Sequence, residues 1–236
     1  MGTLRVASLT PSLTSVLVKM GLGPVMARAI AGVNGTCYFL TSLVALPMVE
    51  RFGRRPLMIW TALLQAFTFA ILAGLYNITT YDANKVAQGF SVLMLFLFNT
   101  WFSVGWLGMT WLYPAEITPL AIRQPANALS TATNWIFNFM VVMCTGPMFE
   151  NIGWGTYAFF ACCNFVIILP VVYFFFPETK GKSLEEIDLI FAYAYEHHEN
   201  PVKVSTSKNL LPKGGSREAE VILGRIHHEK VQHGEA

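Results

Sequence analysis

Polar and aromatic side chains recur at helical spacing within one apolar stretch of this sequence. Asn99, Ser103, Trp106 and Thr110 follow one another at intervals of four, three and four residues, which places them on one face of a helix. Hydroxyl and amide groups beside an indole ring suit a carbohydrate, because they hydrogen-bond its hydroxyls while the ring covers its C–H face. One interpretation of this stripe is therefore a sugar-binding surface inside a helical bundle.

A second polar face follows in the next apolar stretch. Thr131, Asn134 and Asn138 share one side of that helix, and Trp135 lies beside them. The alternative interpretation is structural, since Asn, Ser and Thr hydrogen-bond neighbouring helices in membranes and Trp gathers at the membrane surface. The residue types alone favour neither interpretation.

Charged residues gather in the short segments between apolar stretches. Residues 50–55 have the sequence E-R-F-G-R-R, Glu116 and Arg123 flank a later segment, and Glu178 follows the last apolar stretch. Acids matched with arginines can form ion pairs that join helix ends in one conformation and separate in another. Anchoring by positive charge at the cytoplasmic surface would explain the arginines but not the acids.

Five apolar stretches must position these side chains. Each is free of Asp, Glu, Lys and Arg and is long enough to cross a bilayer as a helix, which takes about 20 residues. Only 13% of the 236 residues are charged, whereas a soluble domain carries about a quarter. The sequence therefore predicts an all-α integral membrane protein rather than a large soluble core. The expected transmembrane helices lie near residues 30–49, 57–75, 89–112, 129–148 and 157–176, within a bundle over residues 28–177.

The remaining residues form two flanking segments. Residues 1–27 do not match a signal peptide and are expected to be an atypical N-terminal segment. Residues 178–236 are expected to be a cytoplasmic tail, because the arginine-rich loops share one side with Lys180 and Lys182 under the positive-inside rule. Ser183 followed by acids predicts a short amphipathic helix near 183–196. The part from about residue 199 onward lacks periodicity and is expected to be flexible.

The sequence offers little support for catalysis or for nucleic-acid binding. There is no nucleophile paired with a base, no glycine-rich phosphate loop and no metal-ligand spacing, so neither an enzyme nor a cofactor or metal is expected. The net charge is only +2 and no dense basic surface appears, so nucleic acid is not an expected partner. The expected partners are a lipid bilayer and a sugar.

Four ordered motifs resemble those of sugar porters in the major facilitator superfamily, especially the fungal-type members. Residues 50–55 resemble the family's E-R-x-G-R-R motif, and residues 114–116 together with Arg123 resemble its P-x-E…R motif. Asn134 and Trp135 match the family's N-W pair, and residues 177–181 match its P-E-T-K-G motif. The resemblance covers roughly residues 20–204. It implies that the five helices correspond to helices 8–12 of a twelve-helix fold.

This resemblance also implies roles for individual residues. It places four residues beside the sugar, and these are Ser103, Trp111, Asn134 and Trp135. It likewise implies an intracellular charge network made of Glu50, Arg51, Arg54, Arg55, Glu116, Arg123 and Glu178. The chain departs from the family pattern at residues 105–108, which lack the usual proline, and at Tyr38, where many members have a sugar-binding Asn.

As a function, the resemblance implies transport of a hexose or disaccharide by alternating access, with or without proton co-transport, in the plasma membrane. Residues 1–27 show nothing like the family's seventh-helix sugar motif, so we expect a truncated form that represents the C-terminal part of a porter. A missing N-terminal half or an intact porter is then an expected partner, because alternating access moves two halves against each other. The alternative is a membrane fragment that does not transport and instead associates with, or regulates, a full-length porter.

Overall fold

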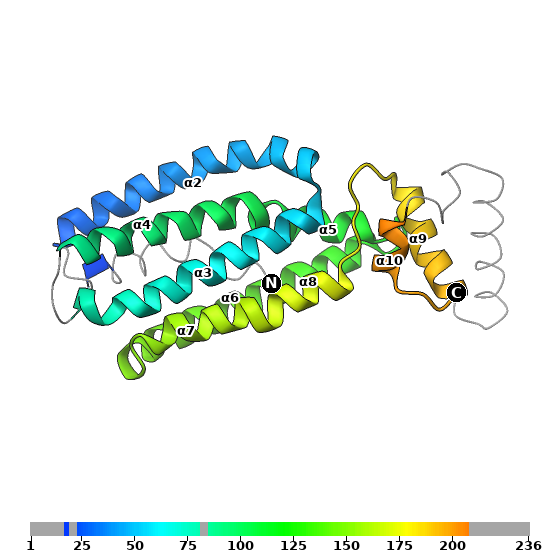
Figure 1. Cartoon of the computed structure of the whole chain (residues 1–236). Coiled ribbons are helices and arrows are strands. Elements are labelled where there is room, and N and C mark those ends of the chain that lie inside the picture. The colour runs from blue at the N-terminus through cyan, green and yellow to red at the C-terminus, as the bar shows by residue number, and fades with distance from the viewer. Residues whose placement is uncertain (1–16, 19–22, 81–84, 208–236) are drawn as a thin grey trace.

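The structure, a computed structural model, describes residues 17–18, 23–80 and 85–207. Five long rods of helix lie along one another (Figure 1). The first two rods are α2 (Pro24–Phe52) and α3 (Arg54–Thr80). The third joins α4 (Lys85–Phe102), the π-helical turn η1 (Ser103–Leu107) and α5 (Met109–Ile117). The fourth is α6 (Arg123–Asn151), and the fifth joins α7 (Gly155–Cys162), the π-helical turn η2 (Cys163–Ile168) and α8 (Leu169–Phe175).

The five rods coincide with the five predicted helices, and the all-α fold class is confirmed for the described residues. Four rods are long and apolar enough to cross a membrane, and they cover residues 24–52, 54–76, 85–117 and 155–175. The rod α6 is long enough, with 29 residues, but it is not among these four. Its Asn, Ser and Thr residues lower its hydropathy, and its crossing of the membrane stays a prediction.

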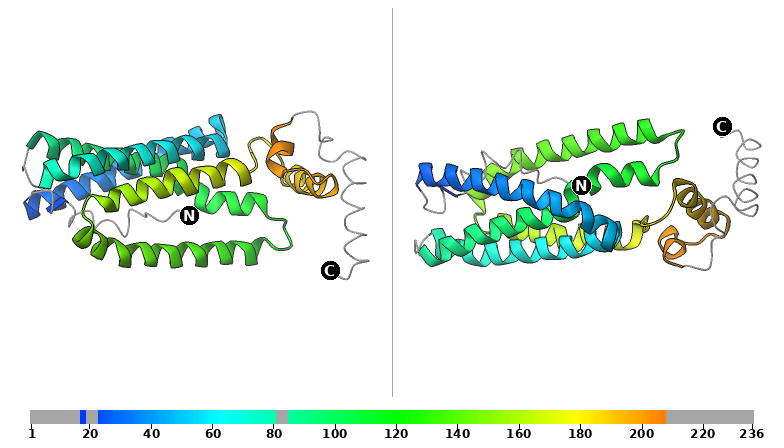
Figure 2. Two further views of the ribbon diagram at one scale, coloured as in Figure 1. Left: turned by 60° about the horizontal axis from the view of Figure 1, so that its bottom comes forward. Right: turned by 90° about the horizontal axis from the view of Figure 1, so that it is seen from above.

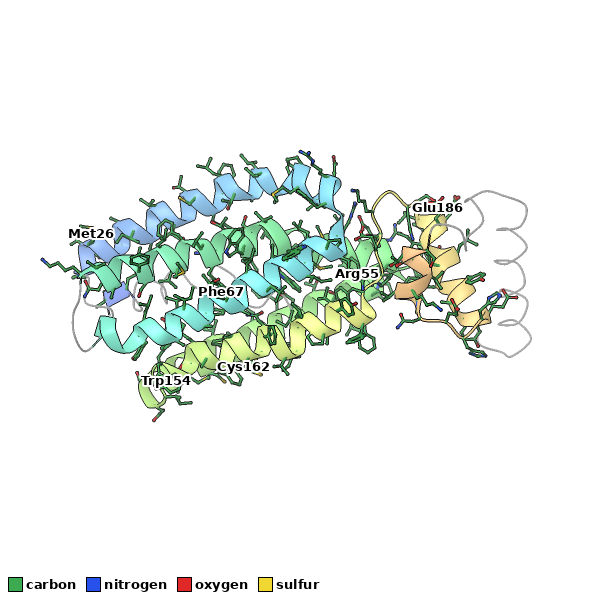
Figure 3. The ribbon with its side chains drawn as sticks, in the orientation of Figure 1. Met26, Arg55, Phe67, Trp154, Cys162 and Glu186 are labelled. Atoms are coloured by element: carbon green, nitrogen blue, oxygen red, sulfur yellow. The ribbon has the colours of Figure 1, made fainter. Side chains whose placement is uncertain are left out.

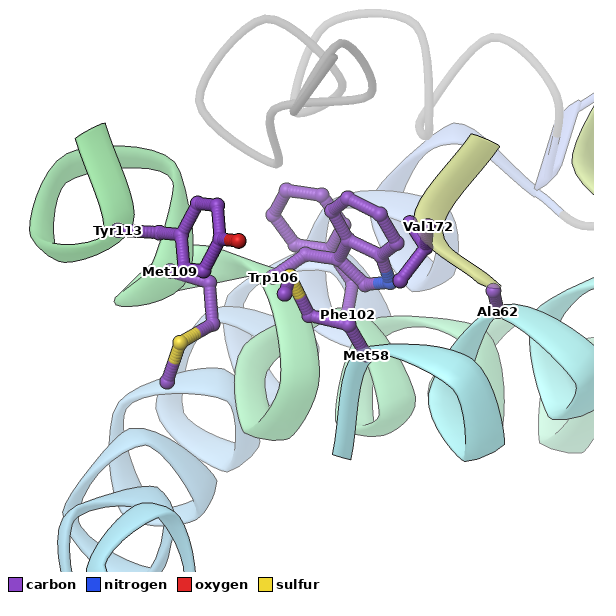
Figure 4. Packing of buried hydrophobic residues seen from close by; sticks show 7 residues of the cluster. All are labelled: Met58, Ala62, Phe102, Trp106, Met109, Tyr113 and Val172. Atoms are coloured by element: carbon purple, nitrogen blue, oxygen red, sulfur yellow. The ribbon is translucent and has the colours of Figure 1, made fainter. Parts of the chain in front are cut away.

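Large apolar side chains cover the outside of the bundle, as contact with lipid requires. Leu46, Phe67, Phe139 and Phe175 are each at least 66% exposed. Soluble monomers rarely expose so much contiguous apolar surface. Inside, the main cluster joins α3, α4, η1, α5 and α8 (Figure 4), and its buried members are Met58, Ala62, Phe102, Trp106, Met109, Tyr113 and Val172.

A glycine in η1 permits a close contact between two rods. Gly105 lies against Thr61 of α3, and a Cβ atom at position 105 would lie 1.8 Å from the Thr61 hydroxyl oxygen. That hydroxyl donates to the Leu57 carbonyl oxygen of its own helix at 2.8 Å. The third rod therefore packs against α3 at this point only because residue 105 has no side chain.

Two short helices, α9 (Leu184–Glu196) and α10 (Pro201–Thr206), lie beyond one end of the bundle (Figures 1 and 2). Ser183 begins α9 with a reciprocal cap, as its hydroxyl accepts the Glu186 N–H at 3.2 Å and its own N–H donates to the Glu186 carboxylate at 2.9 Å. Thus α9 lies where the sequence predicts a short amphipathic helix.

Residues 201–206, for which the sequence predicts no regular structure, form α10. The Asn200 side chain accepts the Val202 N–H at 2.9 Å, and Pro201 occupies the first turn. Val202 and Val204 are buried, so burial compensates for the short length of this helix. The part of the predicted tail from residue 208 onward, and most of the predicted segment 1–27, lie outside the described residues.

The connections from α2 to α3, from α5 to α6 and from α8 to α9 all lie at the end of the bundle beside α9 and α10 (Figure 1). Arg55 marks this end, whereas Met26 and Trp154 mark the opposite end (Figure 3). We call it the charged end, because it carries the arginines and acids at positions 50–55, 116, 123 and 178. The topology therefore gathers charges that are far apart in the sequence.

Candidate functional site

A cavity of about 170 Å³ lies between α3, η1, α5, α6 and the chain just after α8. One wall is apolar and carries methionine and aromatic side chains, while the polar groups come from η1, α5 and α6. The lining residues are Met58, Trp106, Met109, Thr110, Tyr113, Pro114, Ser130, Asn134 and Phe176. A mostly apolar wall with a few polar groups is the usual make-up of a small-molecule site.

Two polar groups on this cavity lack hydrogen-bond partners. Asn134 is 2% exposed, and neither its amide nitrogen nor its amide oxygen has a partner among the described residues. The indole nitrogen of Trp106 is likewise buried and without a described partner. A buried polar group left without a partner costs about 1–3 kcal/mol. Groups of this kind indicate a place where water or a ligand completes the hydrogen bonding.

The four residues that the sequence places beside a sugar are divided between the interior and the surface. Asn134 lines the cavity, while Ser103 is buried and donates its hydroxyl to the Tyr38 carbonyl oxygen at 3.2 Å. Trp111 and Trp135 are 43% and 51% exposed and do not line the cavity. The cavity instead brings Asn134 together with Trp106, a member of the polar stripe that the family resemblance does not place beside the sugar.

Among the described residues, the charged end contains one ion pair between neighbouring rods. The Arg54 guanidinium lies 2.7 Å from a carboxylate oxygen of Glu116, and both side chains are mostly buried. The second carboxylate oxygen of Glu116 accepts the Thr179 hydroxyl at 2.6 Å. Glu116 therefore links the beginning of α3 to the segment that follows α8.

Glu178 binds backbone rather than arginine side chains. Its two carboxylate oxygens accept the N–H groups of Arg54 at 3.0 Å and Arg55 at 3.1 Å, and one of them also accepts the Lys180 N–H at 2.9 Å. These first amides of α3 have no partner within the helix, and the helix dipole favours an anion there. Gly53 has φ 96°, a backbone conformation that favours glycine, and a Cβ at this position would also lie 3.0 Å from a Glu178 oxygen and press on its carboxylate.

The other predicted members of the charge network make different contacts. The Arg55 guanidinium donates to the Tyr173 carbonyl oxygen at 2.7 Å and lies 5.2 Å from the centre of that ring. The Arg123 guanidinium donates to the Thr118 carbonyl oxygen at 3.2 Å, across the turn between α5 and α6. The side chains of Glu50 and Arg51 are exposed, and neither forms an ion pair with a described residue.

A protein-family model described as "Sugar (and other) transporter" matches residues 11–191. The chain belongs to this family. The match covers all five rods and most of α9.

Curated relatives and a solved structure agree with this assignment. The chain is 43% identical over 196 residues to the sugar transporter STL1 of Saccharomyces cerevisiae, covering 83% of this chain and 33% of the relative. It is 37% identical over 183 residues to high-affinity glucose transporter 1 of Candida albicans, covering 71% and 33%. The crystal structure of a D-xylose-proton symporter superposes with a TM-score of 0.63 at 25% identity, covering 72% of this chain and 39% of that one. The chain thus spans about a third of the length of these curated relatives and is, like them, an integral membrane protein.

Proposed function

We propose that this chain is the C-terminal part of a sugar transporter that moves its substrate by alternating access. The observation that carries the proposal is the pair of unpartnered polar groups on one cavity, the Asn134 amide and the Trp106 indole N–H. A sugar hydroxyl can supply both partners, and the apolar wall suits the C–H faces of a sugar ring. Relatives named as sugar and glucose transporters, and a solved xylose symporter, support a sugar such as a hexose or pentose as the substrate.

Trp111 and Trp135 have a different proposed part from Asn134. They are exposed on the described chain, where a second half of a transporter can close over them and hold a sugar between the halves. Ser103 is proposed to act indirectly, because its hydroxyl is bound to the Tyr38 carbonyl oxygen and so links the third rod to α2.

The charge network is proposed to close the charged end in one conformation and to separate in another. The Arg54–Glu116 ion pair and the binding of Glu178 to the first amides of α3 are the contacts that must break. In this proposal the charged end and the C-terminus face the cytoplasm, since arginines gather on the cytoplasmic side of membrane proteins. The plasma membrane is the proposed location, as for the family.

Proton co-transport is proposed only by likeness to the D-xylose-proton symporter. The five charge-free stretches of the chain hold no Asp or Glu, so a co-transported proton needs a carrier outside them. Uptake that collapses with a protonophore supports coupling, while uptake that persists indicates facilitated transport.

The test is uptake of labelled hexoses and disaccharides by cells without their own carriers, with Asn134→Leu compared to the unchanged chain. We expect uptake to fall about tenfold or more, which corresponds to loss of a hydrogen-bonded contact of about 1.4 kcal/mol. The unfolding midpoint should not fall, because leucine removes a buried amide without a partner. Thr133→Val, one position away on an exposed side of α6, is the control.

Two outcomes would count against this proposal. If Asn134→Leu leaves uptake unchanged, the cavity takes no part in sugar binding. If the chain shows no uptake but co-purifies with an intact porter, the second candidate function, a membrane fragment that associates with a porter, is favoured instead.

A further inference from the structure

The short helix α10 packs back onto the segment that ends the membrane bundle. Val204 is completely buried and lies in a cluster with Ile190 and Ala194 of α9. The Asn200 side chain, which caps α10, also donates to the Phe174 carbonyl oxygen of α8 at 3.4 Å. Thus α10 is fixed both to α9 and to the end of the last rod.

Ser205 of α10 contacts the backbone of Glu178. Its hydroxyl accepts the Glu178 N–H at 3.1 Å and donates to the Val202 carbonyl oxygen at 2.9 Å. The Lys182 ammonium donates to the Ser205 carbonyl oxygen at 2.6 Å. Ser205 is 7% exposed, so these bonds are shielded from competing water.

Glu178 is therefore held from two directions. Its backbone N–H is bound to α10, while its carboxylate binds the first amides of α3. Since the carboxylate must stay within hydrogen-bond distance of two adjacent amides, a shift of the Glu178 backbone weakens both bonds.

We propose that α10 is a strap that positions Glu178 on the N-terminus of α3, with Ser205 and Lys182 as positioning residues. The inference rests on the proposed function, in which Glu178 leaves α3 when the charged end opens. When α10 loses its hydrogen bond to Glu178, the chain shifts toward the open form. While α10 stays bound to Glu178, the charged end is held closed.

The strap can be tested on the whole chain in lipid nanodiscs by hydrogen–deuterium exchange, with no need for transport. We expect Ser205→Ala to accelerate exchange at the amides of Arg54, Arg55 and Lys180 about fivefold, as loss of one hydrogen bond predicts. Ser205→Thr keeps the hydroxyl and should restore slow exchange. Exchange in the middle of α7 and α8 should not change, because those amides are bonded within their own rods.

Thr206→Ala is the matched control. The Thr206 hydroxyl donates to the same Val202 carbonyl oxygen at 2.9 Å, and within the described part of the chain it forms no hydrogen bond with Glu178. Thr206→Ala should leave the three amides as slow as in the unchanged chain. Any of three results would overturn the strap and make α10 a packing element only. Thr206→Ala could accelerate exchange as much as Ser205→Ala does, Ser205→Ala could leave exchange unchanged, or Ser205→Thr could fail to keep exchange slow.

Uptake by the same variants separates this inference from the proposed function. We expect Ser205→Ala to alter the maximal rate of uptake by about fivefold and to leave KM nearly unchanged, because no strap residue lines the cavity. An effect on KM alone contradicts the strap. If hydrogen exchange responds as expected but neither the variants nor the unchanged chain transport sugar, the strap is supported and the proposed transport function is contradicted.

Discussion

Gly105 and Thr61 form a contact that leaves no room for a methyl group at position 105. A Cβ there would lie 1.8 Å from the Thr61 hydroxyl oxygen and 2.5 Å from its Cβ atom, well inside contact distance. The two residues join the π turn of the third rod to α3. The contact fixes the spacing of these rods beside the main buried cluster, to which the neighbouring Trp106 belongs.

The first prediction concerns this contact. Gly105→Ala should destabilise the chain by about 1–3 kcal/mol, because α3 and η1 must move apart to admit the methyl group. Gly108→Ala is the control, since a Cβ at position 108 meets nothing within 4 Å. Unfolding followed by circular dichroism in detergent measures both variants. Helix propensity alone would make both substitutions stabilising, because alanine favours a helix more than glycine does. Equal effects of the two substitutions would therefore show that the Thr61 contact does not determine the stability at position 105.

The second prediction concerns the cap on α3. Glu178→Gln replaces a charged carboxylate, which has two acceptor oxygens, by a neutral amide with only one. The variant therefore cannot accept both the Arg54 and the Arg55 N–H groups with separate oxygens, and it carries no negative charge at the N-terminus of α3. We expect a loss of about 1–2 kcal/mol of unfolding free energy, the usual range for a helix cap. Glu150→Gln, an exposed residue at the opposite end of the bundle, should change little. Unchanged stability of Glu178→Gln would mean that water replaces the carboxylate without cost.

The third prediction compares two ion pairs in one chain. Arg54 and Glu116 are 17% and 15% exposed at their side chains, whereas Lys203, paired with Glu199 at 3.2 Å, is 70% exposed. A double-mutant cycle with Arg54→Gln and Glu116→Gln should give a coupling energy of about 0.5–3 kcal/mol. The equivalent cycle on the exposed pair should give about 0.5 kcal/mol or less, because water screens it. Similar values for both pairs would contradict a special role for Arg54–Glu116.

The fourth prediction concerns pH. Burial raises the pKa of the Asp188 carboxyl in α9 above its usual value, although the Arg123 guanidinium acts in the opposite direction. The folded chain therefore binds this proton more readily than the unfolded chain. Stability should fall as pH rises from about 4, the ordinary pKa of Asp, through the raised value in the folded state.

The Asp188→Asn variant checks this expectation, since it removes the titrating group. The unfolding free energy of Asp188→Asn, taken relative to that of the unchanged chain, should rise as pH increases from about 4, because only the unchanged chain loses the contribution of protonated Asp188. Identical slopes for the two proteins would show that Asp188 makes no net contribution to the pH dependence.

Local patterns in the sequence were sufficient to locate the five rods and α9. Charge-free stretches of helical length predict all five rods, and Ser183 followed by Glu186 predicts the beginning of α9. The α10 helix was not predicted, because it depends on contacts between distant residues: Val204 lies 14 positions after Ile190, and Ser205 lies 27 positions after Glu178. A six-residue segment has no periodicity that could indicate such packing.

The candidate site was only partly predictable. The motif places Asn134 and Trp135 next to each other, but it does not say that one is buried and the other exposed. The acids and arginines of the charged end predict ion pairs, and Arg54 and Glu116 form one. Glu178 instead binds main-chain amides. This contact depends on where α3 begins relative to the end of α8, and residue types alone do not predict it.

The π turn at residues 103–107 puts the two parts of the third rod out of phase. An uninterrupted α-helix advances by roughly 100° per residue, so one extra residue in a turn rotates everything after it by a comparable angle. Trp111 and Glu116 come after this turn, while Asn99 comes before it. Conversion of the turn to α-helix would rotate Trp111 and Glu116 together about the rod axis. One local change of winding can thus re-aim the exposed indole and withdraw the acid that holds Arg54 in the same movement.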